Sequence, residues 1–137
     1  MRLLGIDFGL KRVGLSVSDR TGTLVSPLKT IVRTTRDALF DELTEIIQDE
    51  SIEAVVVGLP LSMDGQDTLT TRQARNFADS LGRRFDIPIH LMDERLTSAQ
   101  AEEELNAADV RGKKRKMALD SQAAVIILRS WLECEQS

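Results

Sequence analysis

The sequence predicts an α/β fold: a five-stranded mixed sheet, three strands antiparallel and then two parallel, with helices on both faces. Short apolar runs separated by turn residues fill the first quarter of the chain, as in an antiparallel meander. Helical apolar spacing then alternates with β-branched runs, which is typical of parallel strands joined by helices. The 137 residues, 42% of them hydrophobic, are enough for one domain with a real core, and we expect that domain to span 1–137.

Composition limits the classes of function. The net charge of −4 excludes a globally basic nucleic-acid coat, so any polyanion must bind a local patch. The single cysteine, Cys134, excludes an internal disulfide and a cysteine-built zinc site, and fits a reducing compartment. No charged leader and no run of 18 apolar residues is present, so we expect a cytoplasmic protein without a membrane span.

The first predicted strand, Leu3–Phe8, is an apolar run that contains one carboxylate, Asp7. A carboxylate among apolar side chains loses hydration, so it needs hydrogen-bond donors, a cation or a proton. Gly9 allows the chain to turn directly afterwards without crowding a ligand. Arg12 could supply positive charge to a nearby phosphate. This stretch is therefore the first candidate for a functional site.

The remaining elements follow in order. Strands are predicted at Val13–Ser18 and Leu24–Lys29, joined by the turn-rich tetrapeptide Asp19–Gly22. Helical spacing then marks a first helix, and the run Ala54–Gly58 reads as a buried strand followed by a loop to Gly65. The later elements are a helix around Ala74–Leu81, a strand at Ile87–Met92, and a helix from a capping-box signature at Thr97 and Gln100 through Leu105.

The last helix places Asp120 at a position that faces the sheet. Its apolar stripe includes Ala124, Ile127, Leu128 and Trp131, and counting back four residues from Ala124 gives Asp120. An alternative is that Asp120 is only the N-cap of this helix. Its coincidence with Asp7 favours a shared role, because two carboxylates at the rim of one core can share a cation.

Asp93 and Glu94 form a third acidic element at the end of the fifth strand, where functional groups of α/β sheets collect. Strand alternation lets only one of them face the site, and we favour Glu94 for its longer reach. The alternative is a solvated charged turn. The only histidine, His90, is interpreted as a strand residue. Together the acidic positions suit Mg²⁺ or Mn²⁺, which prefer oxygen ligands.

A basic run, Arg111–Lys116, places five cations in six residues shortly before Asp120. A run of this kind is usually a solvated, mobile loop. Its position beside the acidic elements makes Lys113, Lys114, Arg115 and Lys116 candidates for contact with a phosphate backbone.

Four ordered segments resemble the motifs of the YqgF (RuvX-like) family. They are Gly5-Ile6-Asp7-Phe8-Gly9 with Arg12 and Gly14; Gly58-Leu59-Pro60-Leu61 with Met63-Asp64-Gly65; Asp93-Glu94-Arg95-Leu96-Thr97; and Asp120 with Ala123-Ala124 and Ile127-Leu128. The resemblance spans nearly the whole chain. One departure is Thr68, where the family usually has a further glycine.

The resemblance implies an RNase H-like fold and a Mg²⁺-dependent (or Mn²⁺-dependent) endonuclease. Members are described as Holliday junction resolvases or as nucleases that process pre-16S rRNA, so the implied partners are branched DNA, structured RNA and a ribosomal precursor particle. The implied catalytic residues are Asp7, Asp93, Glu94 and Asp120, with Asp7, Glu94 and Asp120 as metal ligands. Arg12 and the basic run would position the nucleic acid, and Gly9, Gly58, Pro60, Gly65 and Arg95 would line the cleft.

Two other classes of function compete with this reading. An ATP-binding module of the actin-like superfamily also uses an Asp-x-Gly turn, but a complete enzyme of that type needs two such domains. A non-catalytic nucleic-acid-binding factor could keep the fold without the activity. The presence of all the matched carboxylates favours catalysis.

Overall fold

The computed structural model describes residues 1–62, 64–94, 97–108 and 113–135. Its centre is one five-stranded sheet in the order β3-β2-β1-β4-β5. The strands are β1 (Leu3–Phe8), β2 (Arg12–Ser18), β3 (Val25–Val32), β4 (Ala54–Leu59) and β5 (Ile89–Asp93). β1 pairs antiparallel with β2, and β2 with β3, whereas β4 is parallel to both β1 and β5. The predicted mixed sheet of three antiparallel and two parallel strands is confirmed.

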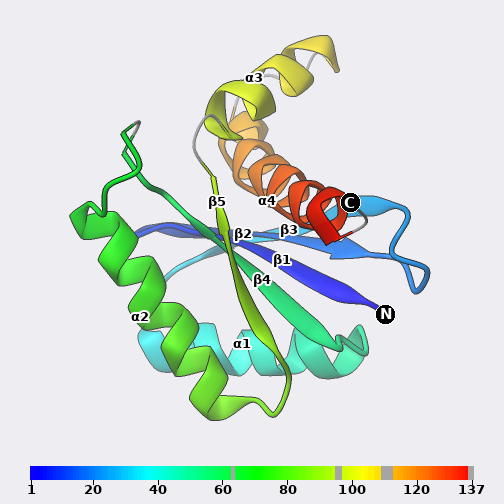
Figure 1. The fold of residues 1–137 in the computed structure, drawn as a ribbon, viewed down its shortest axis with the longest axis vertical. Coiled ribbons are helices and arrows are strands. Elements are labelled where there is room, and N and C mark those ends of the chain that lie inside the picture. Colours follow the sequence, from blue (N-terminus) through cyan, green and yellow to red (C-terminus); the bar gives the residue numbers. More distant parts are fainter. Residues whose placement is uncertain (63, 95–96, 109–112, 136–137) are drawn as a thin grey trace.

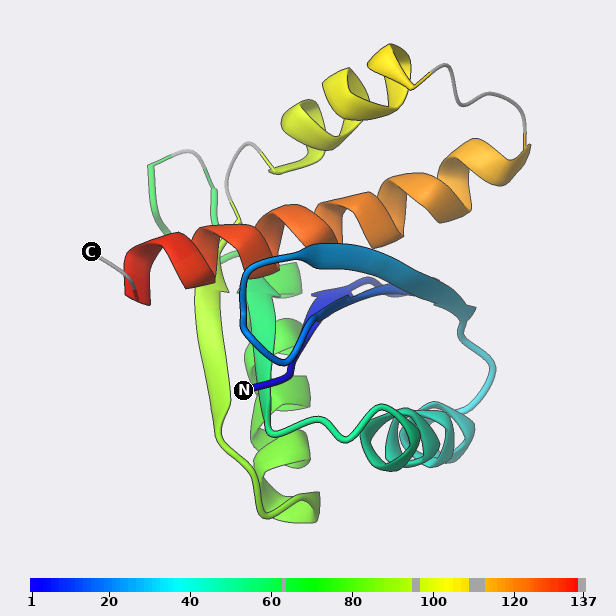
Figure 2. The same ribbon diagram turned by 90° about the vertical axis from the view of Figure 1, so that its right-hand side faces the viewer.

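Helices cover both faces of this sheet (Figures 1 and 2). They are α1 (Arg36–Asp49), α2 (Leu69–Arg84), α3 (Thr97–Ala107) and α4 (Lys113–Glu135). Figure 2 shows α1 and α2 on one side of the sheet and α4 on the other, with α3 outside α4. Among the helices described, none combines the length and apolar character needed to cross a bilayer.

Strand alternation assigns each residue of β1 to one face. Leu4, Ile6 and Phe8 belong to the larger core, which α1 and α2 complete. Phe77 of α2 stacks on Phe8 with ring centroids 4.5 Å apart, and Phe40 of α1 lies 5.7 Å from Phe77. The intervening positions, Leu3, Gly5 and Asp7, therefore face α4.

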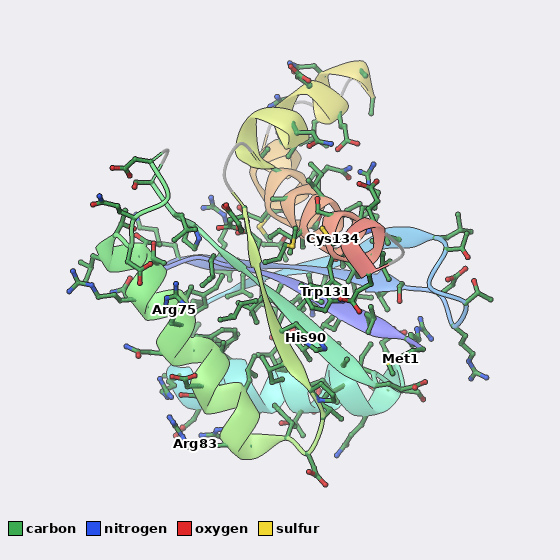
Figure 3. All side chains as sticks on the ribbon, in the orientation of Figure 1. Met1, Arg75, Arg83, His90, Trp131 and Cys134 are labelled. Atoms are coloured by element: carbon green, nitrogen blue, oxygen red, sulfur yellow. The ribbon has the colours of Figure 1, made fainter. Side chains whose placement is uncertain are left out.

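The core under α4 is smaller and ends near the chain termini. Leu3, Ala54 and Val56 of the sheet pack against Ile127 and Leu128 of the helix. At its border the ring of His90 stacks on Trp131 at 4.4 Å (Figure 3). His90 is thus a strand residue in contact with α4.

α3 packs on the outer side of α4. Ala101 of α3 packs against Ala123 and Ile126 of α4. Glu104 accepts a hydrogen bond from Gln122 at 3.0 Å and forms an ion pair with Arg129 at 2.7 Å. The side chain of Thr97, on which the predicted capping box depends, lies outside the described residues.

Two predicted strand boundaries need correction. β3 runs to Val32 and not to Lys29, because the antiparallel ladder with β2 continues until Arg12 pairs with Val32. β5 begins at Ile89 and includes Asp93, because Pro88 has no N–H for the ladder and Asp93 still pairs with Leu59.

The start of α4 excludes two of the alternatives that the sequence left open. The helix begins at Lys113, so Asp120 lies two turns inside it and is not its N-cap. Residues 113–116 are the first turn of this helix and not a loop before Asp120, consistent with the good helix propensity of lysine and arginine.

Thr68 has a local structural role. It is the N-cap of α2: its side chain accepts a hydrogen bond from the Thr71 N–H, and the Thr71 hydroxyl accepts one from the Thr68 N–H. The Thr71 hydroxyl lies 2.6 Å from the Pro60 carbonyl, to which it donates. Threonine in place of the usual glycine therefore gives this helix a capping box, which is worth about 1 kcal/mol over an alanine N-cap and roughly a few tenths of that over glycine.

Candidate active site

Asp7 lies in a row of residues that crosses the sheet on the α4 face. Gly14 of β2 pairs with Asp7 on one side, and Thr30 of β3 pairs with Gly14. On the other side, the β1–β4 register runs from Leu3↔Ala54 to Ile6↔Val57, so one further step places Asp7 beside Gly58. Asp7 is thus flanked by two glycines. Without Cβ atoms on either side, other groups can approach its carboxylate.

Gly14 lets the backbone of α4 descend onto the sheet. A Cβ atom on Gly14 would lie 2.0 Å from the Asp120 carbonyl oxygen, far inside van der Waals contact. Two hydroxyls hold the helix there: Ser16 donates to the Ala124 carbonyl at 2.7 Å, and Thr30 donates to the Met117 carbonyl at 2.5 Å. Asp120 lies between these two anchors, and this arrangement brings it to Asp7.

Gly58 makes room for Glu94 on the opposite side of Asp7. A Cβ on Gly58 would lie 2.3 Å from Oε2 of Glu94 and 2.5 Å from Cδ1 of Ile127. The Glu94 N–H donates to the Leu59 carbonyl at 3.0 Å, which continues the β4–β5 pairing by one residue. Glu94 is therefore held over Gly58 and beneath α4.

Asp93 points the other way. It pairs with Leu59, a member of the core under α1 and α2, and it is exposed. The structure therefore places Glu94, and not Asp93, beside Asp7. Their roles in catalysis remain predictions.

Burial and mutual repulsion raise the pKa of both central carboxyl groups. Burial is the main cause for Glu94, and the neighbouring Asp7 and Asp93 charges add to it, bringing its pKa to about 9. Burial also raises the pKa of Asp7 to about 6, although a hydrogen bond from Glu94 lowers it and Asp120 raises it. At neutral pH the Glu94 carboxyl thus carries a proton that it donates to the Asp7 carboxylate.

Asp120 is paired with Arg12. The Arg12 Nε donates to Oδ2 of Asp120 at 2.6 Å, and both side chains are partly exposed. Sequence reasoning assigned Arg12 to a substrate phosphate. In the structure Asp120, a proposed metal ligand, neutralises this charge. The guanidinium must therefore leave Asp120 before Arg12 can contact a phosphate and Asp120 can bind a metal ion.

The chemistry of these residues fits a hard divalent cation. They are carboxylates, and Oε2 of Glu94 is buried without a hydrogen-bond partner, a state that a cation would relieve. Within the residues described, however, no group of three histidine, cysteine, aspartate or glutamate side chains already surrounds one point. Asp7 and Glu94 already contact each other, whereas Asp120 is held in an ion pair with Arg12.

The predicted cleft residues lie at the same end of the sheet. Gly9 forms the β1–β2 turn, where a Cβ would lie 2.4 Å from the Arg12 carbonyl oxygen. Pro60 follows β4 directly, and Gly65, with φ of 83°, donates its N–H to the Ser62 carbonyl at 2.8 Å. Arg95 lies outside the described residues, as do the side chains of Lys113, Lys114 and Lys116. Arg115 is half-buried on α4.

Sequence reasoning missed the two hydroxyls that position α4. A signal for Ser16 was present in β2, where Gly14, Ser16 and Ser18 alternate with apolar residues. Such alternation marks a face of small polar residues that a helix backbone can approach closely.

Comparison with known proteins agrees with this fold. A sequence model described as "RuvX: Holliday junction resolvase" matches residues 1–134. A protein of Maridesulfovibrio salexigens named "Putative pre-16S rRNA nuclease" is 61% identical over 132 residues, covering 96% of this chain and 98% of the relative.

Solved structures resemble the fold at low sequence identity. T. thermophilus RuvC in complex with a Holliday junction has a TM-score of 0.62 at 15% identity, covering 100% of this chain and 97% of RuvC. The fowlpox virus resolvase bound to junction DNA has a TM-score of 0.64 at 8% identity, with both chains fully covered. These neighbours show an RNase H-like fold, as expected. The sequence model that matches residues 1–134 and the 61% identical relative establish that the chain belongs to the RuvX family.

Proposed function

We propose that this protein is a divalent-metal-dependent endonuclease that cleaves structured RNA, acting in 5′-end maturation of pre-16S rRNA. The observation that carries the proposal is the convergence of Asp7, Glu94 and Asp120, from three separate elements, around two glycines on one face of the sheet. The name of the 61% identical relative supports rRNA as the substrate class. The substrate would then be met in the cytoplasm, on a ribosomal precursor particle.

Asp7 and Glu94 would hold the cation, which supplies Lewis acidity toward phosphoryl oxygens when bound. Binding requires Glu94 to release its proton, so metal affinity should rise with pH. Asp120 would join them once Arg12 turns to a substrate phosphate, since a phosphate competes with the carboxylate for the same guanidinium. Arg12 would thereby couple the binding of the nucleic-acid strand to the release of Asp120 for metal binding.

A cleavage assay on a defined panel tests the proposal. The purified chain is incubated with a precursor rRNA fragment that spans the 5′ end of 16S rRNA, a four-way DNA junction and a linear duplex. Each reaction is run with Mg²⁺, with Mn²⁺ and with a chelator, and the Asp7→Asn variant controls for contaminating nucleases. We expect internal, metal-dependent cleavage of the precursor fragment.

Cleavage of the junction in preference to RNA would favour the second candidate, a Holliday junction resolvase, which the family description supports. Tight binding without cleavage of any substrate would instead identify a non-catalytic factor and would overturn the proposal.

A further inference from the structure

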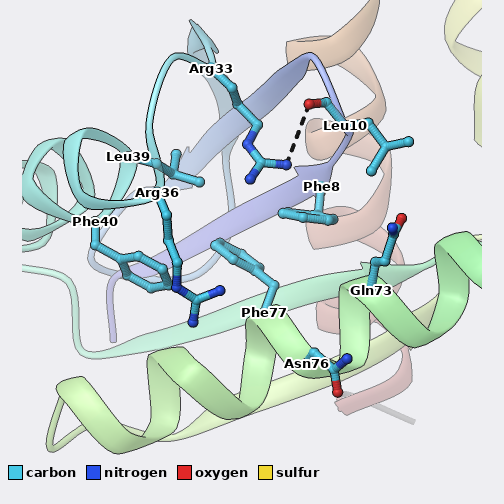
Figure 4. Close-up of a pocket in the computed structure, with 9 residues that line it drawn as sticks. All are labelled: Phe8, Leu10, Arg33, Arg36, Leu39, Phe40, Gln73, Asn76 and Phe77. Carbon is cyan, nitrogen blue, oxygen red and sulfur yellow. Dashed lines mark hydrogen bonds between the residues drawn. The ribbon is translucent and has the colours of Figure 1, made fainter.

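A cavity lies on the opposite face of the sheet from the carboxylates. We call it the β1-end cavity. Its volume is about 300 Å³, and its walls include Phe8, Leu10, Arg33, Arg36, Gln73 and Phe77 (Figure 4). Two of its lining residues are arginines and none is acidic, although the chain as a whole is acidic. The cavity therefore favours an anionic ligand.

Aromatic rings and neutral acceptors hold both guanidinium groups. Arg33 lies 5.0 Å over the Phe8 ring and donates to the carbonyls of Gly9 and Leu10 at 3.2 and 3.4 Å. Arg36 lies 5.1 Å over the Phe40 ring and donates to the Ser80 hydroxyl at 2.6 Å. Within the described part of the chain, neither pairs with a carboxylate. Their charge is thus oriented in advance and remains available to an anion.

Gln73 adds an unsatisfied hydrogen-bond acceptor. Its Oε1 atom is buried and has no hydrogen-bond partner, whereas most buried polar atoms are paired. Gln73 lines the cavity, so a turn of its side chain would let an N–H donor that enters the cavity satisfy this atom. Nucleobases present such donors on exocyclic amino groups and ring nitrogens, and they stack on guanidinium planes.

The cavity is close to the candidate active site along the chain. Phe8 follows Asp7 directly, and the two side chains point to opposite faces of β1. Leu10, 58% exposed, stands at the β1–β2 turn between them. A nucleic-acid strand that passes over this turn could reach both faces at the carboxyl end of β1.

We propose that the β1-end cavity binds one unpaired nucleotide of the substrate strand. The base enters beside the guanidinium groups and donates a hydrogen bond to Oε1 of Gln73, while Arg33 and Arg36 contact its phosphate. This inference rests on the proposed function for the identity of the polymer. It adds a requirement for a single-stranded nucleotide near the cleavage position.

Binding measurements with a chelator present test the cavity separately from cleavage. A labelled single-stranded RNA and a duplex of equal length are titrated against the full chain and against Arg36→Met. The variant should bind the single strand about tenfold more weakly, as expected for loss of one stacked base or phosphate contact. Its salt slope should become shallower by about 0.7. The control Arg20→Met removes the same charge from an exposed turn distant in sequence and should change affinity less than twofold.

Gln73→Leu tests base recognition, with little risk to folding because it removes a buried unpaired acceptor. In the wild type, one abasic position in the RNA should weaken binding. In Gln73→Leu that position should have a smaller effect, which a double-mutant cycle measures. Equal losses in Arg36→Met and Arg20→Met, or an unchanged abasic effect, would overturn the inference.

Cleavage measured in parallel separates the two proposals. Normal metal-dependent cleavage with unchanged binding in the cavity variants rejects only the nucleotide site. Cavity-dependent binding without cleavage rejects only the nuclease.

Discussion

The two faces of the sheet are built from the same strands and differ in the side chains that those strands present to the helices. Toward α1 and α2, β1 contributes Leu4, Ile6 and Phe8, and rings and branched side chains fill the space. Toward α4, the same strand contributes Gly5 and Asp7, and glycines in β2 and β4 flank Asp7 so that the backbone of Asp120 and the side chain of Glu94 can come close. The apolar face therefore stabilises the fold by close packing around β1, whereas on the α4 face the missing Cβ atoms let Glu94 and the α4 backbone approach Asp7.

This difference explains how a carboxylate can be central to a small domain. The apolar face supplies the burial that offsets the desolvation of Asp7 and Glu94. Substitutions of the core side chains on the apolar face should then change stability more than activity, and substitutions of the carboxylates on the α4 face should change activity more than stability.

Adjacent residues of β1 give the largest expected contrast. Asp7→Asn should reduce the cleavage rate by at least about 100-fold, as expected for loss of a group that acts on transition-state charge, while leaving stability equal or higher. Ile6→Val should cost about 1 kcal/mol of stability with little change in rate per folded molecule. For both variants, the cleavage rate is measured from initial rates in Mg²⁺ and the stability from urea denaturation. Wild-type cleavage by Asp7→Asn would remove the metal-site assignment.

The next contrast is between the two acidic residues at the end of β5. Because Glu94 faces Asp7 and Asp93 faces away, Glu94→Gln should reduce metal-dependent cleavage by about 100-fold and Asp93→Asn by less than about tenfold. Rates are compared at saturating metal. Equal, small losses would reject this element as catalytic.

The two glycines beside Asp7 sharpen the comparison further. In Gly14→Ala the new Cβ meets the backbone of α4, which cannot give locally, so we expect a loss of about 2–3 kcal/mol in the free energy of unfolding. In Gly58→Ala the nearest atoms are the ends of the Glu94 and Ile127 side chains, which can move. That variant should fold nearly normally and cleave at least about tenfold more slowly, because Glu94 is displaced. Denaturation and cleavage of both variants are measured, and equal stability losses would contradict this account.

The shared proton predicts a pH dependence of stability in the absence of metal. The folded pKa of Glu94 lies near 9, above its usual 4.5, so between these values the folded state retains a proton that the unfolded state releases. The contribution of Glu94 to the free energy of unfolding should therefore fall as pH rises through this window, and it should be highest at the acidic end. Glu94→Gln should flatten the slope and raise stability at pH 8 by about 1–2 kcal/mol. Urea denaturation across the window, with chelator, measures it. An unchanged slope would place Glu94 outside the buried pair.

The basic run should show the smallest effect. Replacing Lys113, Lys114, Arg115 and Lys116 by alanine preserves helix propensity and removes cations from the first turn of α4. Affinity for nucleic acid should fall with little sequence preference, and the slope of log affinity against log salt should become shallower by about 0.7–0.9 per lost contact. Turnover at saturating substrate should change less than affinity. An unchanged salt slope would assign these cations to a solvated surface.

Much of the fold could be predicted from local patterns. The apolar run Leu3–Phe8, the turn at Asp19–Gly22 and the apolar run Ala54–Gly58 identified the strands and their mixed arrangement. Boundaries were less accurate at β3 and β5, where partner strands decide how far a ladder continues. The start of α4 could not be placed from the sequence because a cluster of like charges is typical of a solvated loop, whereas packing on β2 and β3 stabilises the helix that includes residues 113–116.

The sequence by itself determined which carboxylates could matter and that Asp93 and Glu94 must face different sides, because side-chain direction in a strand has a period of two. Only the tertiary structure decided that Glu94 is the one beside Asp7, that Asp120 is held by Arg12, and that Gly14 and Gly58 clear the space between them. These contacts join residues separated by up to 108 positions in the chain. No local sequence pattern covers so long a separation. These contacts form only in the folded molecule, where the strand register fixes the side-chain positions and glycine lets the helix backbone come close to the sheet.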